Sequence, residues 1–285
     1  HVSGLGILFR CLLAHAAVVL PDSDASLAES LAGRQVTHLS LVATQLYRLL
    51  EDEANHEPLR QLKAILLGGS AIPATIIEKA CAIGLKIHTS YGLTEMASQV
   101  TTTRPGETLE GLRTSGQPLS AGNSKLSHDN EICVHGETLF LGYRVSHGFD
   151  LPVDSEGWFH TGDLGHWDNA GRLVVEGRKD NRFVFGGENV QPEETERCLL
   201  AIEGIEQAIV VPVNDPEYGQ IPVAFLQYAP GFEKGIEAAP ARLRESLPGF
   251  KIPKRILPWP SQLATSERKP DRKALTRYAE ELLNS

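Results

Sequence analysis

Residues 88–95 concentrate side chains that could bind a nucleotide and its metal ion. Tyr91 offers an aromatic face on which a base can stack, and Gly92 lets the backbone come close to a ligand. The hydroxyl of Thr94 can bond a phosphate oxygen, and Glu95 can supply the oxygen ligand that Mg²⁺ prefers. The same residues would also suit a strand, a turn and a helix start with a hydroxyl cap. On this stretch alone, both interpretations stay open.

Two further turns carry groups that suit a nucleotide. Gly68-Gly69-Ser70 follows an apolar run, and the backbone N–H groups of such a turn favour anions. Asp163, in Thr161-Gly162-Asp163, has only acceptors on its carboxylate and can take both hydroxyls of a cis-diol such as ribose. A glycine turn can equally well precede a helix, and a Gly-Asp pair is usually a plain turn former.

Two basic segments follow towards the C-terminus. Residues 177–180 (GRKD) fit a tight turn between strands, and residues 268–273 (RKPDRK) precede the last expected helix. Most basic runs of this kind are solvated loops, so neither segment indicates a site by itself.

Taken in order, these motifs resemble those of the adenylate-forming superfamily, which includes acyl-CoA synthetases, luciferases and peptide-synthetase adenylation domains. The resemblance covers essentially the whole chain. It implies that Tyr91 stacks on adenine, that Thr94 contacts the α-phosphate and that Glu95 binds magnesium. The remaining nucleotide-binding residues that it implies are Gly68, Gly69, Ser70, Gly92, Asp163 and Arg178, the last two near the ribose.

The resemblance also assigns roles in the second part of the chain. Lys269 matches the catalytic lysine, Asp180 matches a hinge between two domains, and Gly186 and Gly187 would let the thiol of CoA approach. The sequence departs from the family at two places. Val184 and Phe185 stand where members often carry lysine and serine, and Arg268 stands where a glycine usually precedes the lysine.

Residues 1–10 are similar to the corresponding segment of bacterial 2-succinylbenzoate–CoA ligases, which implies an acid pocket with His1, Ser3, Arg10 and Ser90. Arg10 stands between apolar neighbours, so the sequence predicts a buried guanidinium that needs an anion. A dicarboxylate substrate would supply that anion. An internal salt bridge to Asp or Glu would serve equally well.

The elements that must position these residues alternate between strand and helix. Apolar strands are expected at residues 37–42, 63–67 and 85–89, with helical patterns between them. This order predicts a parallel sheet covered on both faces, with ligands at the carboxyl ends of its strands. The glycine turn and residues 90–95 both follow such a strand.

The expected fold class is α/β, with a parallel-sheet subdomain and a small β subdomain in residues 1–178. Residues 179–285 are expected to form an α+β C-terminal domain, which the resemblance implies is mobile about Asp180. Pro192 is expected to begin a helix and Asp271 to cap the last one.

Composition limits the function classes. A net charge of −9 provides no basic footprint for nucleic acid. The most apolar stretch, residues 5–20, is too short to span a bilayer, and the four separated cysteines give no zinc signature. A cytoplasmic location is therefore expected. The chain begins at His1 without a methionine, so a fragment of a longer protein is expected.

The implied function is an AMP-forming acid–CoA ligase that uses ATP, Mg²⁺ and CoA, with an aromatic diacid as substrate. One alternative is a ligase for another acid, or an adenylation domain that loads a carrier protein. Another is a non-catalytic nucleotide-binding module, because the family's Ser/Thr/Gly-rich phosphate loop is absent from this sequence.

Overall fold

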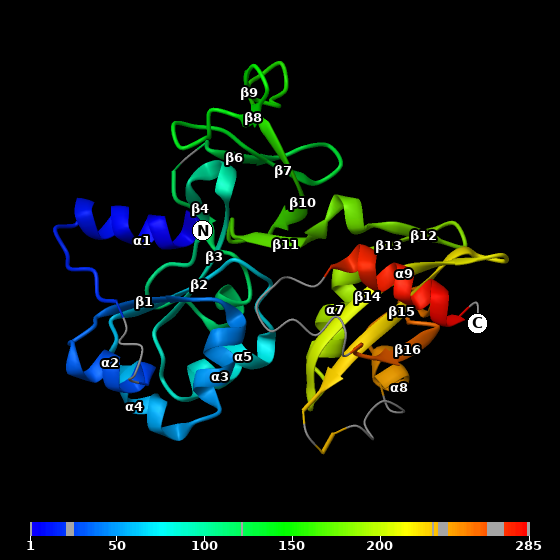
Figure 1. The fold of residues 1–285 in the computed structure, drawn as a ribbon, viewed down its shortest axis with the longest axis horizontal. Coiled ribbons are helices and arrows are strands. Elements are labelled where there is room, and N and C mark those ends of the chain that lie inside the picture. The colour runs from blue at the N-terminus through cyan, green and yellow to red at the C-terminus, as the bar shows by residue number, and fades with distance from the viewer. Residues whose placement is uncertain are drawn as a thin grey trace. The chain divides into compact units, whose positions relative to one another are not determined.

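The chain divides into two compact units, residues 1–175 (unit 1) and 176–285 (unit 2), which are described separately. The computed structural model describes residues 2–20, 26–120, 122–229, 231–232, 239–260 and 271–283 (Figure 1). The division falls close to the boundary expected after Arg178, although the role of Asp180 as a hinge stays a prediction.

The largest sheet of unit 1 has the order β1-β2-β3-β4-β5. Its strands are β1 (His38–Leu41), β2 (Ala64–Leu67), β3 (Ile87–Leu93), β4 (Ser98–Thr102) and β5 (Gln117–Pro118). The first three are parallel, as the alternating pattern predicts, and β4 and β5 extend the sheet in antiparallel fashion. The parallel register places Leu67 beside Thr89, so the chain leaves β2 at Gly68 next to the point where β3 runs on to Leu93 paired with β4 alone.

Unit 1 has six α-helices in its described part, of which α2 to α6 pack against one face of the parallel strands. They are α1 (Val2–Leu13), α2 (Leu27–Gly33), α3 (Ala43–Leu50), α4 (His56–Gln61), α5 (Ala74–Ala82) and α6 (Leu109–Leu112), with the short helices η1 (Glu53–Asn55) and η2 (Thr94–Met96). Buried residues of α2 to α6 form one core with Ile65, Leu67 and Ile87 (Figure 1). The second face is less well covered than the sequence predicts, because Ser40 and Leu66 remain half-buried.

A smaller β subdomain completes unit 1, as expected. Its main sheet has the order β11-β10-β7-β6, formed by β6 (Ser124–Leu126), β7 (Glu131–Val134), β10 (Phe159–Trp167) and β11 (Leu173–Arg178). A separate hairpin joins β8 (Tyr143–Val145) and β9 (Gly148–Asp150). The core of the subdomain includes Met96 and Val100, so it packs directly against the segment that follows β3.

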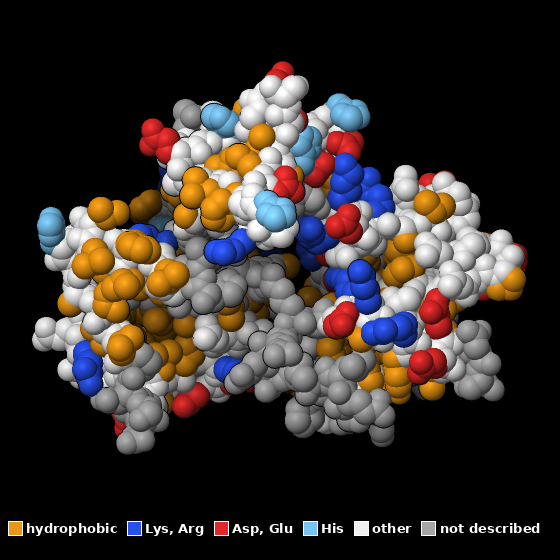
Figure 2. All heavy atoms as spheres, turned by 45° about the horizontal axis from the view of Figure 1, so that its top comes forward, with side chains coloured by type: hydrophobic (Ala, Val, Ile, Leu, Met, Phe, Trp, Pro, Cys, Tyr) orange, Lys and Arg blue, Asp and Glu red, His pale blue; other side chains and the backbone are white. Residues whose placement is uncertain are grey.

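Helix α1 exposes much of its apolar surface. Leu5, Leu8, Phe9 and Leu12 are 41–60% exposed, and Leu13 is 84% exposed. The side chains at positions 5, 8, 9 and 12 share one stripe of the helix. Figure 2 shows hydrophobic side chains gathered on the surface of unit 1.

Unit 2 is an α+β domain, as predicted. Its sheet has the order β13-β12-β15-β14, and β16 pairs with β15. The strands are β12 (Phe183–Phe185), β13 (Glu188–Val190), β14 (Ile205–Asp215), β15 (Gly219–Tyr228) and β16 (Arg255–Pro258). The helices are α7 (Pro192–Leu200), α8 (Ala239–Leu243), α9 (Arg272–Leu283), η3 (Lys179–Asn181) and η5 (Gly249–Lys251).

Two sequence features mark where helices begin in unit 2. Pro192 occupies the first turn of α7, where its missing N–H leaves no hydrogen bond unmade. Asp271 caps α9, because its Oδ1 accepts from the Ala274 N–H at 3.2 Å. Arg272 then donates to both carboxylate oxygens of Glu196, at 2.6 and 2.7 Å, and so ties α9 to α7.

Among the helices that the structure describes, none is both long enough and apolar enough to cross a bilayer.

Candidate functional site

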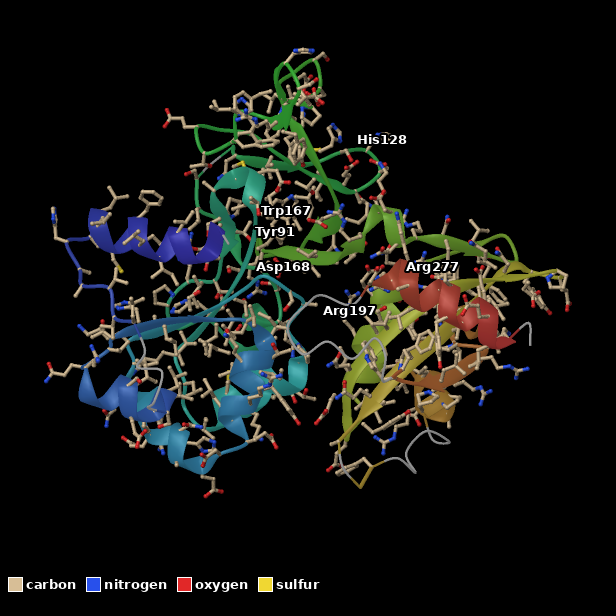
Figure 3. All side chains as sticks on the ribbon, viewed as in Figure 1. Tyr91, His128, Trp167, Asp168, Arg197 and Arg277 are labelled. Carbon is tan, nitrogen blue, oxygen red and sulfur yellow. The ribbon has the colours of Figure 1, made fainter. Side chains whose placement is uncertain are left out.

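Tyr91 and Asp163 meet in unit 1. The hydroxyl of Tyr91, on β3, donates to Oδ2 of Asp163, on β10, at 2.7 Å. The ring of Tyr91 also packs against the core of the β subdomain, as does Trp167 (Figure 3). The hydroxyl and the ring of Tyr91 are therefore both held in place, next to a carboxylate that could accept from a ligand's hydroxyls.

Gly68 and Ser90 are also brought together, by the parallel pairing of β2 and β3. Ser90 donates from its hydroxyl to the Leu67 carbonyl at 2.9 Å. A Cβ at Gly68 would lie 2.7 Å from that hydroxyl, so a larger residue there would displace the Ser90 side chain. Gly69 has φ +82°, which also favours glycine. Gly69 and Ser70 are exposed, so their backbone is open to a ligand.

The segment from Ser90 to Leu93 is not a turn that leads into an α-helix. Strand β3 continues to Leu93, η2 makes one short turn, and β4 returns antiparallel to β3. A Cβ at Gly92 would lie only 1.9 Å from the Ser98 carbonyl oxygen. In this structure, close packing of the hairpin is therefore what requires glycine at position 92.

Thr94 and Glu95 form the short turn between these strands. Thr94 is exposed and Glu95 is half-buried. The hydroxyl of Tyr143 donates to Oε1 of Glu95 at 2.8 Å, a contact that no pattern in the sequence indicated. A backbone hydrogen bond from the Phe140 N–H to the Glu95 carbonyl, 2.8 Å long, fixes the same residue.

These contacts fit a magnesium site built on one carboxylate. Mg²⁺ commonly takes one or two protein carboxylates and completes its shell with water and substrate phosphates. Glu95 has a second carboxylate oxygen beyond the one that accepts from Tyr143. No group of three or more His, Cys, Asp or Glu residues that could hold a metal occurs in the described ranges. The residues present therefore suit a phosphate-bound ion better than an ion enclosed by protein ligands.

Arg10 is exposed, so the prediction of a buried guanidinium was wrong. Sequence neighbours of a helical residue point in other directions, and apolar residues beside Arg10 therefore do not enclose it. Its Nη1 donates to Gln99 Oε1 at 3.0 Å and lies 3.5 Å from Ser98 Oγ, both on β4. Because β4 pairs with β3 through Gly92 and Leu93, Arg10 lies beside the hairpin that carries residues 88–95.

In unit 2, Arg178 precedes the short helix η3 and Asp180 lies within it. Arg178 Nη2 lies 3.7 Å from Asp180 Oδ2, and both side chains are exposed. Two hydrogen bonds hold the backbone of Arg178 to the segment at the start of α7. Its N–H donates to Glu193 Oε1 at 3.3 Å, and its carbonyl accepts from Gln191 Nε2 at 3.0 Å.

Gly186 and Gly187 form the two-residue turn between β12 and β13. Both have positive φ, +55° and +89°, which a tight hairpin of this kind requires. The side chain of Lys254 stacks over the ring of Phe185, 4.9 Å from its centroid, and close to Tyr218. The glycines are thus explained by the hairpin, and their exposed backbone remains open to a ligand.

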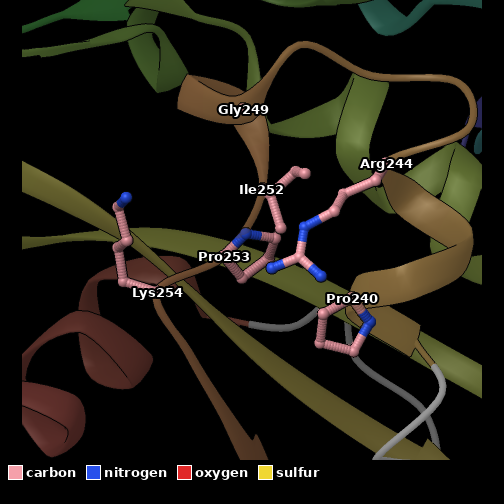
Figure 4. Close-up of a pocket in the computed structure, with 6 residues that line it drawn as sticks. All are labelled: Pro240, Arg244, Gly249, Ile252, Pro253 and Lys254. Atoms are coloured by element: carbon pink, nitrogen blue, oxygen red, sulfur yellow. The ribbon is translucent and has the colours of Figure 1, made fainter.

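An open pocket of about 430 Å³ occurs in unit 2 (Figure 4). None of the residues predicted for the site lines it. The lining residues are Pro240, Arg244, Gly249, Ile252, Pro253 and Lys254.

Three predicted residues cannot be located. His1 and Lys269 lie outside the described residues, as does the side chain of Ser3. Their roles stay predictions from the sequence.

Comparison with known proteins decides the family. The profile of the AMP-binding enzyme family matches residues 1–144, and that of the AMP-binding enzyme C-terminal domain matches residues 194–269. The chain belongs to the AMP-binding enzyme family. The membership agrees with the resemblance drawn from residues 88–95 and the motifs that follow them.

Several members of the AMP-binding family are similar over nearly the whole chain. The 2-succinylbenzoate–CoA ligase of Salmonella typhimurium is 40% identical over 278 residues, which are 98% of this chain and 58% of that protein. The Escherichia coli enzyme of the same name is 37% identical over 280 residues, again 98% and 58%. The chain therefore spans little more than half the length of these curated relatives.

Solved structures of AMP-binding enzymes agree with the fold. The o-succinylbenzoate CoA synthetase (MenE) of Bacillus subtilis in complex with AMP is 30% identical, with a TM-score of 0.82 over 96% of this chain and 58% of that one. An Escherichia coli MenE variant with bound OSB-AMS is 36% identical, with a TM-score of 0.81 over 99% of this chain and 59% of that one.

Proposed function

We propose that the protein to which this chain belongs is an AMP-forming acid–CoA ligase. Its reaction would convert 2-succinylbenzoate, ATP and CoA to 2-succinylbenzoyl-CoA, AMP and pyrophosphate, a step of menaquinone biosynthesis. The observation that carries the proposal is the contact between Tyr91 and Asp163, in a chain 40% identical to a ligase of that name. A cytoplasmic location belongs to the same proposal.

In the first half-reaction, a carboxylate oxygen of the acid attacks the α-phosphorus of ATP, and the bond to pyrophosphate breaks. The chain's task is to hold the nucleotide while anions approach one another. The ring of Tyr91 would stack on adenine, and Asp163 would accept from the ribose hydroxyls. The exposed hydroxyl of Thr94 would donate to the α-phosphate, and Ser70 and the backbone of Gly68 and Gly69 would face the nucleotide.

Glu95 is the proposed magnesium ligand. When bound, Mg²⁺ would offset the negative charge of the phosphates. The hydrogen bond from Tyr143 would keep the carboxylate of Glu95 turned towards the ion. A Bacillus subtilis MenE structure in complex with ATP and magnesium, 31% identical to this chain, supports the choice of ion.

In the second half-reaction, the CoA thiolate attacks the acyl carbon and AMP leaves. Lys269 would act only in the first half-reaction, where its ammonium would stabilise charge on the phosphate. Rotation about Asp180 would then exchange Lys269 for the turn at Gly186 and Gly187, with Arg178 near the ribose. This exchange is carried over from the adenylate-forming resemblance.

Arg10 is the proposed partner of the second carboxylate of the diacid, with His1, Ser3 and Ser90 in the same pocket. The position of Arg10 beside the β3–β4 hairpin supports this role, and its contacts to Ser98 and Gln99 are to neutral side chains. The charge of Arg10 is therefore available to an anion, and no ion pair to it occurs in the described part of the chain.

Pyrophosphate release in the presence of a panel of acids tests the proposal. The protein is incubated with ATP and Mg²⁺, and each of 2-succinylbenzoate, benzoate, succinate and a long-chain fatty acid is added in turn. Release that is greatest with 2-succinylbenzoate, followed by thioester formation when CoA is added, is the expected result. Preference for another acid, or transfer only to a carrier protein, would contradict the substrate or the acceptor.

A further inference from the structure

The loop that carries Asp163 is a bulge in an otherwise regular ladder. Strand β10 pairs with β7 up to His160 and again from Leu164, so residues 161–163 lie opposite Ile132 alone. Bulges of this kind re-aim side chains and are frequent next to binding sites. Gly162, in the middle of the bulge, has φ +74°, a conformation that favours glycine.

Two side chains hold the bulge where the ladder is broken. The carboxylate of Glu131, at the start of β7, accepts from the Gly162 N–H through Oε1 at 2.9 Å. The hydroxyl of Thr161 accepts from the Asp163 N–H at 3.1 Å and donates to the Ile132 carbonyl at 2.8 Å. The N–H groups of Gly162 and Asp163 therefore both have side-chain partners, although regular strand pairing is interrupted at these residues.

Glu131 is itself fixed. It is 6% exposed, and its Oε2 lies 3.3 Å from His160 Nδ1. The other ring nitrogen of His160 lies 3.4 Å from Asp154 Oδ2, which restrains the imidazole from its far side. Cys133 also lies near this ring, but burial raises the pKa of its thiol, so Cys133 stays neutral and adds no competing charge. A buried carboxylate with partners on both oxygens has little freedom to move.

The direction of the Asp163 side chain depends on this arrangement. Its Oδ2 accepts from the Tyr91 hydroxyl at 2.7 Å, which requires the bulge to hold Asp163 on the side of β10 that faces β3. We infer that Glu131 is a positioning residue for Asp163: by binding the Gly162 N–H, it fixes the bulge that aims the Asp163 carboxylate at the ribose. The inference rests on the proposed ribose contact of Asp163.

A purely structural role for Glu131 makes a different prediction. If Glu131 only satisfied a buried N–H, its loss would lower the stability of the fold and leave the selectivity for the ribose hydroxyls unchanged. If it aims Asp163, its loss would lower that selectivity even though Asp163 and Tyr91 are intact.

The test compares the affinity for AMP with that for 2′,3′-dideoxy-AMP, which lacks both ribose hydroxyls, by isothermal titration calorimetry. AMP is a suitable probe because it needs neither pyrophosphate nor acid for binding. The wild-type chain is expected to prefer AMP by about tenfold or more, the size of a hydrogen bond to a charged group. Glu131→Leu is expected to reduce the preference to about threefold or less, because a carboxylate that is no longer aimed at the ribose keeps at most the weak end of a hydrogen bond to it.

Two further variants serve as controls. Glu131→Gln keeps an acceptor for the Gly162 N–H and is expected to retain most of the preference. Thr161→Val removes the other support of the bulge with almost no change in shape, and it is expected to reduce the preference as Glu131→Leu does. Thermal unfolding of each variant shows whether it folds, and if Glu131→Leu does not, Thr161→Val decides.

The outcomes separate the two hypotheses. Loss of the preference in Glu131→Leu or Thr161→Val, with retention in Glu131→Gln, supports the inference. An unchanged preference in the folded variants overturns it and leaves the ribose role of Asp163 intact. A wild-type preference in Asp163→Asn would overturn that ribose role, and the inference with it.

Discussion

The hydroxyl of Tyr91 and the carboxylate of Asp163 share a hydrogen bond of 2.7 Å across a sequence separation of 72 residues. The contact gives Tyr91 two tasks, because its ring can stack on a base while its hydroxyl orients the neighbouring carboxylate. Phenylalanine could perform the first task but not the second. The two tasks can therefore be separated by substitution.

We predict that Tyr91→Phe weakens AMP binding by roughly threefold to tenfold, since the hydrogen bond that orients the Asp163 carboxylate is lost but the ring and the carboxylate both remain. Tyr91→Ala is expected to weaken binding further, because base stacking is also lost. Calorimetric titration with AMP measures both. Equal affinities for wild-type protein and Tyr91→Ala would remove Tyr91 from the nucleotide site.

Arg10→Ala is predicted to raise the KM for 2-succinylbenzoate by about tenfold, because a charge-assisted contact to the diacid is lost. The KM for ATP is expected to stay within about twofold, since the role proposed for Arg10 is at the acid and not at the nucleotide. Steady-state kinetics of pyrophosphate release give both values, and Arg10→Lys keeps the charge as a control. A rise in the KM for ATP alone would contradict this role.

At the scale of single residues, the sequence predicted what chemistry a side chain could perform better than it predicted the burial and contacts of that side chain. The side chains of Tyr91 and Asp163 could be proposed for one site because their types suit a nucleoside. The exposure of Arg10 could not be foreseen from its apolar neighbours, which point to other sides of α1. The contact from Tyr143 to Glu95 depends on how a distant hairpin folds, and nothing local to either residue encodes it.

The β3–β4 hairpin is the element on which residues 88–95 depend. Its strands approach so closely that Gly92 has no room for a side chain, with the Ser98 carbonyl oxygen 1.9 Å from the position of a Cβ. The hairpin also receives Arg10 through Ser98 and Gln99. A change in this packing should therefore affect both stability and binding.

We predict that Gly92→Ala lowers the free energy of unfolding by about 1–3 kcal/mol or more, because a methyl group would force the strands apart. Urea denaturation measures the change. Gly33→Ala, at the end of α2, is the matched control, since a Cβ at Gly33 meets nothing within 4 Å. Equal stability of Gly92→Ala and the control would show that the hairpin is not packed as described.

Asp168 closes the turn between β10 and β11 (Figure 3). The Arg172 backbone N–H, followed by the Arg172 guanidinium, holds the pKa of the Asp168 carboxyl below its usual range. A carboxyl with a lowered pKa in the folded state contributes stability above its unfolded pKa of about 3.9 and loses it as the pH falls through the folded value. The turn should therefore weaken in acid.

Asp168→Ala is accordingly expected to lower the urea midpoint at pH 7, with a smaller difference from wild type as the pH falls below about 4. Asp150→Ala is the control, because no side-chain hydrogen bond of Asp150 occurs in the described part of the chain. A difference for Asp168→Ala that stays constant from pH 7 to pH 3 would contradict the role assigned to its charge.

Most elements could be predicted from periodicity and end signals. The parallel order of β1 to β3, Pro192 in the first turn of α7 and the Asp271 cap of α9 follow from local patterns. The continuation of β3 to Leu93 could not, because threonine and serine suit a turn as well as a strand, and pairing with β4 decides between them. The bulge at Gly162 depends on Glu131 in another strand, so it too lay beyond local reasoning.

For the whole molecule, the composition argued against some function classes but did not identify the function. The acidic balance argued against nucleic acid, and the order of the motifs then indicated the AMP-binding family, which the comparisons confirm. The exposed stripe on α1 was not foreseen, since residues 5–20 were considered only as a possible membrane span. Apolar residues at helical spacing predict one face of a helix but not what covers it.

The exposed stripe on α1 leads to a prediction for the chain in solution. Contiguous apolar surface of this kind binds hydrophobic dyes and often marks an interaction site. Substitution of Phe9→Ser together with Leu12→Ser is expected to lower the fluorescence of bound 8-anilinonaphthalene-1-sulfonate by about half, because two of the exposed apolar side chains are removed. Val184→Ser, an isolated exposed apolar residue of unit 2, should leave the signal unchanged. Unchanged fluorescence of the α1 variant would show that the stripe is covered in solution.

The central claim is that segments distant in the sequence converge on one adenylate. A crystal structure of the protein with AMP tests it most directly. The account predicts adenine on the ring of Tyr91 and ribose hydroxyls within hydrogen-bond distance of Asp163. AMP bound elsewhere, or with its ribose turned away from Asp163, would contradict it.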